Sequence, residues 1–274
     1  MKQPVIICFG VCAASLFLAT SIMAAACPSD SVRVGSVCVD KYEASVWSID
    51  PANKGLIGKV QQGKVTLSQL IDGKAVQRGA NADDYDLASC SENGNGCTNV
   101  YAVSISGVTP ARSITWFQAA AACRNAGKRL LTNAEWQVAA FGTPDPGLAG
   151  DGVTTCNTAA PELMSTGSAR NCVSDVGVFD MVGNLWEWVA DWIQGDTNPW
   201  APVTGGKTNA AYGNDLMSGT NPAQTQGDGQ NFPAAIERGG SFNYGDHTDA
   251  GMFALSAAQS ASASFIDLGF RCGR

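Results

Sequence analysis

The segment FDMVGNLWEWVADW, residues 179–192, joins a glycine-containing turn to an alternating pattern. In its second half, residues 185–192, the tryptophans are two or four positions apart, while Leu, Glu, Val and Asp occupy the alternate positions. Successive side chains of a β-strand point to opposite faces, so this pattern predicts a strand over 185–192. One face then carries three large rings, which indicates a heavily packed sheet surface. These rings are Trp186, Trp188 and Trp192.

Two helices are predicted upstream by their N-terminal signals. Thr115 with Gln118, and Thr132 with Glu135, have the spacing of a capping box, in which each side chain bonds the backbone N–H of the other residue. Gly127 supplies a left-handed stop for the first helix. We therefore expect one helix after Thr115 and a second after Thr132.

The rest of the chain predicts one loop-rich domain. Residues 50–81 and 195–231 are rich in Gly, Asn, Asp, Pro and Thr, which is typical of surface loops. The chain has no linker run, internal repeat or charge block, and residues 27–274 are compatible with a single domain.

Composition excludes several classes of protein. The 274 residues are 45% apolar and 15% charged, so a disordered polyelectrolyte is excluded. The formal net charge of -7 gives no basic field for a phosphate backbone, and no nucleic-acid partner is expected. His247 is the single histidine, which excludes sites that need two imidazoles from one chain.

The N-terminus predicts export. Residues 1–26 resemble a signal peptide: Lys2 is basic, an apolar stretch follows, and three alanines precede Cys27. The mature protein, residues 27–274, is then periplasmic or secreted and has no membrane span. Two alternatives stay open, namely a permanent N-terminal span and a cell-surface lipoprotein anchored through Cys27.

Eight cysteines remain after the predicted cleavage, as expected in an oxidising compartment. Eight cysteines allow 105 pairings, so spacing alone does not decide among them. Metal binding by the thiolates is an alternative, although no C-x-x-C pair is present. Short loops favour Cys27 with Cys38, Cys90 with Cys97, and Cys156 with Cys172, which leaves Cys123 for Cys272.

Five segments resemble the formylglycine-generating enzyme family, also called sulfatase-modifying factors. The resemblance implies an α+β, C-type-lectin-like fold that is loop-rich and disulfide-braced. It also implies a disulfide from the first predicted helix to the last strand, Cys123 to Cys272. The segments, in the family's order, are CVDKYEAS (38–45), ITWFQAAAACRNAGKRLLTNAEWQVAAFG (114–142), FDMVGNLWEWVADW (179–192), RGGSF (238–242) and LGFRC (268–272).

The resemblance does not extend to the family's catalytic cysteines. That chemistry oxidises a substrate cysteine at copper held by two thiolates, which follow the RGGS strand. Here no Cys lies between Ser241 and Cys272, so no copper is expected. The sequence predicts no catalytic residues and a non-catalytic binding protein. The alternative is a periplasmic oxidoreductase of the sulfatase-modifying-factor type with a redirected active site.

A structural calcium site is implied by the same resemblance. The side chains of Asp180 and Glu187, and the carbonyls of Gly183 and Leu185, align with the family's calcium ligands. Calcium takes six to eight oxygen ligands from carboxylates, carbonyls and water. The alternative is that Glu187 only satisfies donors beside the tryptophans.

The C-terminal segment, residues 243–267, is the expected binding surface for a protein or glycan ligand. It resembles the variable region of the target proteins of diversity-generating retroelements. The alternative is an ordinary small-residue loop, because eight of the nine residues from 256 to 264 are Ser or Ala. We expect the flanking residues 238–241 and 268–272 to be structural, with Arg271 paired internally. The expected ligand-binding positions are Tyr244, Asp246, His247, Ser256, Ala257, Phe265 and Asp267.

Overall fold

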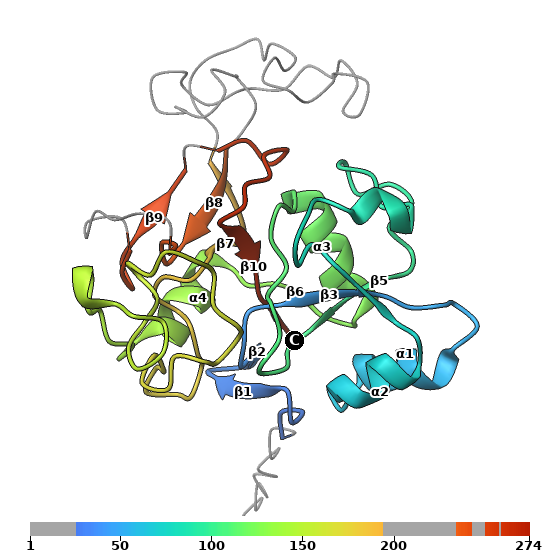
Figure 1. Ribbon diagram of the computed structural model, residues 1–274, viewed down its shortest axis with the longest axis horizontal. Helices are drawn as coiled ribbons and strands as arrows, with labels where there is room; N and C mark the ends of the chain where they lie inside the picture. Colours follow the sequence, from blue (N-terminus) through green and yellow to red (C-terminus); the bar gives the residue numbers. More distant parts are fainter. Residues whose placement is uncertain (1–25, 194–233, 243–249, 258) are drawn as a thin grey trace, which may run out of the picture.

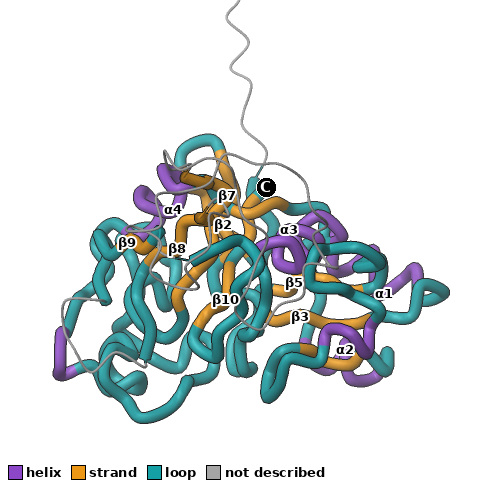
Figure 2. Tube along the Cα trace, turned by 90° about the horizontal axis from the view of Figure 1, so that it is seen from above, coloured by secondary structure: helices purple, strands orange, loops and turns teal. Residues whose placement is uncertain are grey.

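The computed structural model describes residues 26–193, 234–242, 250–257 and 259–274. Loops connect short helices and strands throughout (Figure 2). One side of the molecule carries α1 (Lys54–Gln61) and α2 (Leu67–Asp72), next to β3 (Ser45–Ser48). The other side carries α4 (Asn133–Ala140), as Figure 1 shows. The described residues thus form an α+β, loop-rich structure.

Short strands build three sheets within the described residues. The first has the order β1-β2-β11-β6 and the third the order β4-β3-β5. The second has the order β10-β7-β8-β9, in which β10 is parallel to β7 and the other pairs are antiparallel. The remaining bounds are β1 Ser31–Val34, β2 Val37–Asp40, β4 Val76–Arg78, β5 Val100–Val103, β6 Arg129–Leu130, β7 Trp186–Ile193, β8 Ala234–Arg238, β9 Leu255–Ser256, β10 Leu268–Phe270 and β11 Cys272–Gly273.

Both predicted helices are confirmed. The first is α3 (Trp116–Asn125), whose capping box joins Thr115 to Gln118. The second is α4, which has the same arrangement between Thr132 and Glu135. Gly127 has a φ of +70°, the left-handed conformation expected after the end of α3.

The prediction of surface loop over residues 50–81 is wrong. This stretch holds α1, α2 and β4, together with short connections. The side chain of Asn53 caps α1, and Thr66 begins α2 with another capping box, because its side chain accepts from the Gln69 N–H. Some of the Gly and Asn residues that suggested loop, such as Asn53 and Gly73, lie at the helix ends, whereas Gly55 and Gly58 lie within α1. The predicted loop 195–231 lies outside the described residues.

Strand β7 confirms the alternating pattern and lies between two hydrophobic cores. Trp186 and Trp188 belong to the larger core, and Trp192 packs against it. Val189, on the opposite face, belongs to a second core that includes Trp136 of α4. The register of β7 with β8 shifts between Trp188 and Trp192. One strand thereby joins the two cores.

Four disulfides brace this structure, and their pairing is the expected one. Three close short loops, and the fourth joins α3 to β11 across 149 residues. In the loop-entropy account a bridge of that span stabilises the fold by about 4 to 5 kcal/mol. The pairs are Cys27–Cys38, Cys90–Cys97, Cys123–Cys272 and Cys156–Cys172.

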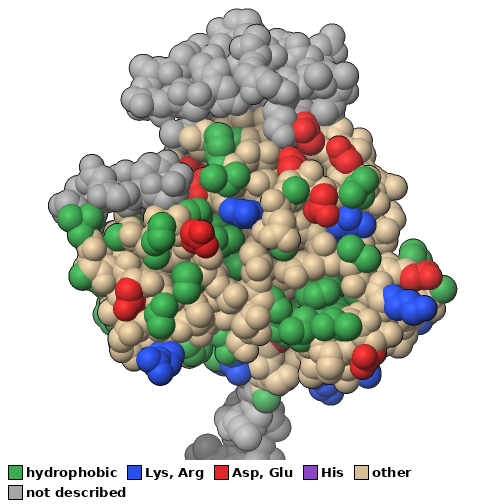
Figure 3. All heavy atoms as spheres, in the orientation of Figure 1, with side chains coloured by type: hydrophobic (Ala, Val, Ile, Leu, Met, Phe, Trp, Pro, Cys, Tyr) green, Lys and Arg blue, Asp and Glu red, His purple; other side chains and the backbone are tan. Residues whose placement is uncertain are grey.

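Two properties of the described residues bear on partners. None of their helices has the length and apolar character required to cross a bilayer. On the face seen in Figure 3, the Lys and Arg side chains are separated from one another and interspersed with acidic ones. That face therefore offers no continuous basic patch for a nucleic acid.

Candidate functional site

A buried ion pair joins the residue between β10 and β11 to β7. Both Arg271 and Glu187 are buried, with side chains 1% exposed. The Arg271 Nε donates to both Glu187 oxygens, at 2.9 and 2.7 Å, and Trp136 Nε1 donates to the same carboxylate at 2.7 Å. Burial lowers the pKa of Arg271, but the charge and hydrogen bond of Glu187, together with the charges of Glu43 and Asp180, raise it overall. The expected internal pairing of Arg271 is confirmed.

Two further carboxyl groups lie close to this pair. Glu43 accepts from the side-chain amide of Asn184 at 2.6 Å and from the backbone N–H of Leu185 at 3.1 Å. Burial, together with the charges of Asp180 and Glu187, raises the pKa of Glu43 well above its usual range. Burial also raises the pKa of Asp180 to about 7, although a hydrogen bond from the Gly167 N–H and the Arg271 charge oppose it.

The two predicted calcium-binding side chains, Asp180 and Glu187, lie in this cluster, where both are close to the guanidinium of Arg271. The guanidinium donates to the backbone carbonyls of Phe179 and Asp180 as well as to Glu187. Among the described residues no group of three or more His, Cys, Asp or Glu is placed to hold a metal ion. The predicted site has only two such side chains, Asp180 and Glu187, and takes its other ligands from backbone carbonyls, so calcium binding stays a prediction.

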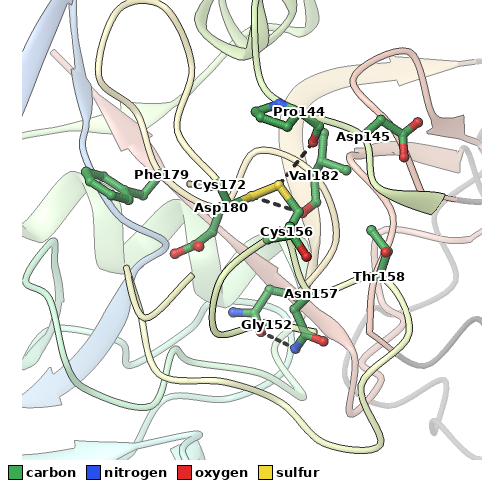
Figure 4. The surroundings of a disulfide bond; sticks show 12 residues. Pro144, Asp145, Gly152, Cys156, Asn157, Thr158, Cys172, Phe179, Asp180 and Val182 are labelled. Atoms are coloured by element: carbon green, nitrogen blue, oxygen red, sulfur yellow. Dashed lines mark hydrogen bonds between the residues drawn. A yellow bond between two sulfur atoms is a disulfide. The ribbon is translucent and has the colours of Figure 1, made fainter. Parts of the chain in front are cut away.

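The turn that carries Asp180 is braced by a disulfide. The Asp180 N–H donates to the carbonyl of Cys172 at 3.0 Å, and Cys172 is bonded to Cys156. Figure 4 shows this disulfide, with Asp180 beside Cys172. Asp180 has a φ of +58°, a strained conformation for a residue other than glycine. The covalent brace and the buried contacts hold the turn in that conformation.

A cavity of about 360 Å³ opens where the C-terminal segment meets the second sheet. Glu237 on β8 and Asp267, just before β10, are both buried, and the Ser241 hydroxyl donates to the Asp267 carboxylate at 2.9 Å. Phe265 is 42% exposed and reaches the surface. The lining residues are Trp186, Glu237, Gln259, Ser264, Phe265, Ile266, Asp267 and Leu268.

The carboxyl group of Glu237 is strongly perturbed. Burial raises its pKa to about 8, the Asp267 charge contributes in the same direction, and a hydrogen bond with Ser256 opposes both. A carboxyl group with this pKa is mostly protonated at neutral pH. The cavity therefore holds a neutral acid beside a second buried carboxyl group.

The expected ligand-binding positions separate into distinct environments. Phe265 and Asp267 line the cavity, and Ser256 pairs with Glu237 between β9 and β8. Ala257 packs against the second core. The positions Tyr244, Asp246 and His247 lie outside the described residues.

The run of Ser and Ala residues is largely internal. Ala261 and Ala263 belong to the larger core, and the carbonyl of Ala261 accepts from the Trp116 N–H at 3.1 Å. Ser260 and Ser262 are buried and hydrogen-bond each other. Close packing against α3 explains why these side chains are small. The exposed part of the segment therefore excludes residues 260–263.

Sequence reasoning missed Trp186, Glu237 and Gln259 as lining residues. The alternation over residues 185–192 indicates only a sheet face for Trp186, and the Ser and Ala composition of residues 256–264 gives no signal for Gln259. Glu237 had a detectable signal, because AAIERGG places an acid directly after three apolar residues. A charged residue in a buried strand is a candidate for a functional site.

The structure defines a class of protein: a disulfide-braced, loop-rich α+β domain with a cavity lined in part by residues 264–267. The chain belongs to the family described as the sulfatase-modifying factor enzyme 1-like domain, whose profile matches residues 59–274. Family membership agrees with the C-type-lectin-like fold that the resemblance implied.

Two curated relatives show how partial the sequence similarity is. A formylglycine-generating enzyme of Streptomyces coelicolor is 34% identical over 106 residues, which are 31% of this chain and 32% of that protein. The serine/threonine-protein kinase pkn1 of Chlamydia caviae is 32% identical over 94 residues, 30% of this chain and 14% of that protein. The matches span about a third or less of these relatives.

Solved structures with a similar chain path include variable proteins. The Major Tropism Determinant U1 variant has a TM-score of 0.47 and 19% identity, covering 90% of this chain and 52% of that one. Treponema denticola variable protein 1 has a TM-score of 0.37 and 16% identity, covering 89% of this chain and 97% of that one.

The residues present do not fit the copper chemistry of formylglycine generation. Copper in that reaction is held by two thiolates, and segment 242–271 contains no cysteine. All eight cysteines in the described part of the chain are in disulfides. A disulfide sulfur is not a thiolate ligand, so no step through copper is derived for this chain.

Proposed function

We propose that this protein is an exported, non-catalytic member of its family that recognises a protein or glycan ligand through its C-terminal segment, residues 243–267. The observation that carries the proposal is the cavity between Glu237 and Asp267. Its exposed rim comes from this segment, while its buried floor comes from the second sheet and from Asp267 at the end of the segment.

The segment begins at a rigid anchor. Arg238 is buried, and its guanidinium lies 4.5 Å from the ring centre of Trp136. Its Nε donates to the Ala254 carbonyl at 2.8 Å, and its Nη2 donates to Met252 at 3.1 Å. A side chain at Gly239 would approach the carbonyl of Met181 to 3.0 Å, so this position requires glycine.

The segment ends at a second anchor, the buried pair of Arg271 and Glu187. Between two such anchors, surface side chains can differ without disturbing either core. Loops on a rigid scaffold are suited to recognition for this reason. Substitution in the anchors is expected to affect folding, whereas substitution at the rim is expected to affect ligand capture.

Export is supported by the cysteines. Four disulfides suit an oxidising compartment rather than the cytosol. The bond between Cys27 and Cys38 uses the thiol to which a lipid would attach, so it favours a periplasmic or secreted protein over a lipoprotein. The proposed signal peptide, residues 1–26, lies almost wholly outside the described residues.

The test compares the wild type with a variant that carries Tyr244→Ala, His247→Ala and Phe265→Ala. Both are applied to a glycan array and to immobilised surface proteins of candidate partner cells. We expect the variant to melt within a few degrees of the wild type and to lose capture. Asp267 is left intact because it is buried.

A control variant carries Leu87→Ala and Phe141→Ala, two exposed apolar residues outside the segment. Capture that survives the triple substitution, or that the control also abolishes, would contradict the proposal. Turnover of a sulfatase-type cysteine peptide with copper and oxygen, above a metal-only reaction, would instead support the oxidoreductase alternative.

A further inference from the structure

The cavity between Glu237 and Asp267 has the volume of a small-molecule site. About 360 Å³ lies within the range of ligand pockets. Trp186, Glu237, Asp267 and Leu268 are at most 8% exposed and form its floor. Phe265 is more exposed and stands at the rim.

Two of the lining residues have titratable side chains, and both of these are acids. Glu237 and Asp267 face the same cavity, and no Lys, Arg or His is among its described lining residues. Arg238 follows Glu237 in the chain, but its guanidinium lies over Trp136 and donates to Asn133 and Gln137. The positive charge of Arg238 therefore contacts other residues rather than the two acids of the cavity.

Two further features of the lining favour a cation that carries N–H groups. Trp186 and Phe265 line the cavity, and aromatic rings attract cations through their π faces. The side-chain oxygen of Gln259 is buried and has no hydrogen-bond donor among the described residues. A buried acceptor without a donor is costly, and a ligand N–H would remove that cost.

We propose that this cavity binds a small organic cation, a primary or secondary ammonium group on an apolar body, between the carboxyl groups of Glu237 and Asp267. The inference rests on the proposed binding function and names the chemical class of its ligand. The ammonium group would pair with the carboxylates and donate to Gln259, while the apolar body would contact Trp186 and Phe265.

The protonation of Glu237 gives the proposal a second readout. Among the described residues, Asp267 is the charged side chain that acts on Glu237, and Ser256 is its hydrogen-bond partner. Because the pKa of the carboxyl group lies near 8 in the empty cavity, a bound cation would drive its ionisation. Binding at neutral pH should therefore release a proton and strengthen as pH rises.

The experiment uses benzylamine as the probe, with benzyl alcohol as the uncharged analogue and benzoate as the anionic one. Calorimetry on the full mature chain at neutral pH, in two buffers of different ionisation enthalpy, measures affinity and proton release together. We expect benzylamine to bind with proton release and neither analogue to bind comparably.

Glu237→Gln should weaken benzylamine binding at least about tenfold, since a charge-assisted contact is lost, and should abolish proton release. Asp72→Asn removes an exposed carboxylate at the end of α2, which does not line this cavity, and is the charge-matched control. The inference is overturned if benzyl alcohol binds as well as benzylamine, if Glu237→Gln binds unchanged, or if benzylamine does not bind at millimolar concentration.

These outcomes are separable from the proposed function. Capture of a protein or glycan that is lost in the triple rim variant, without any benzylamine binding, would refute only the cation site. If the wild type captures no protein or glycan and also binds no benzylamine, both the proposed function and the cation site are refuted. Melting curves of each variant confirm that the folded protein is compared throughout.

Discussion

The hydroxyl of Ser241 donates a hydrogen bond of 2.9 Å to the carboxylate of Asp267. Ser241 ends the first anchor of the C-terminal segment, and Asp267 directly precedes β10. One buried contact therefore ties the start of the segment to its end, 26 residues later. The residues at the two ends of the segment are therefore held together by a hydrogen bond.

Ser241→Ala should weaken this closure. The substitution leaves a buried carboxyl group without one of its donors, which costs about 1 to 3 kcal/mol. We expect a lower melting temperature and faster hydrogen exchange confined to the second sheet. Ser165→Ala, at an exposed position, is the control. Equal stability of the two variants would show that the contact does not close the loop.

Glu187→Gln should strongly destabilise the fold. Arg271 would remain buried without its carboxylate, and breaking a buried pair by removing one partner costs about 3 to 5 kcal/mol. Urea unfolding measures the loss. The control is Glu135→Gln, which removes the more exposed pair with Arg129 and should cost about 1 kcal/mol or less. Similar losses in both variants would contradict the central role of Arg271.

The stability of the protein should fall as pH rises toward 8, in part because of Glu237. Its folded pKa of about 8 lies above that of an unfolded glutamate, so the folded state holds a proton that the unfolded state releases. The favourable contribution is complete below the unfolded pKa and is lost as pH rises through the folded pKa.

Glu237→Gln should remove the part of this dependence that Glu237 contributes, because glutamine does not titrate. Urea unfolding at a series of pH values compares the two proteins, and their stability difference should shift in favour of the variant as pH increases. A pH-independent difference would show that the pKa of Glu237 is not raised.

The calcium prediction is tested by melting curves in calcium and in chelator. An ion bound only by the folded state raises the melting temperature, and Asp180→Ala should remove the gain. Because Arg271 already occupies Glu187, any bound calcium must compete with that guanidinium. Identical melting curves in calcium and in chelator would contradict the prediction. Arg271 would then be the cation that pairs with Glu187.

The mature protein should contain no free thiol. Thiol titration under denaturant and peptide mapping check this, and the Cys123–Cys272 peptide is the decisive one. Replacing both of these cysteines by serine should destabilise the fold by about 4 to 5 kcal/mol in the loop-entropy account. Two or more titratable thiols would reopen metal binding by cysteine.

The sequence by itself determined the elements whose signals are local. The capping boxes at Thr115 and Thr132 act over three residues, so they predicted α3 and α4 without knowledge of the fold. The alternation of tryptophans predicted β7 for the same reason. The equivalent signal at Thr66 was present but was outweighed by the Gly and Asn around it, and α2 was missed.

Only the tertiary structure decided what the distant residues do. Arg271 and Glu187 are 84 residues apart, and Glu237 and Asp267 meet only because β10 lies parallel to β7 while β8 pairs with the other edge of β7. The burial of residues 260–263 also depends on α3 and the core, so the Ser and Ala run alone could not distinguish a packed turn from a variable surface. A pKa or a cavity arises from the groups that surround a side chain, and those neighbours are set by the folded chain rather than by adjacency in sequence.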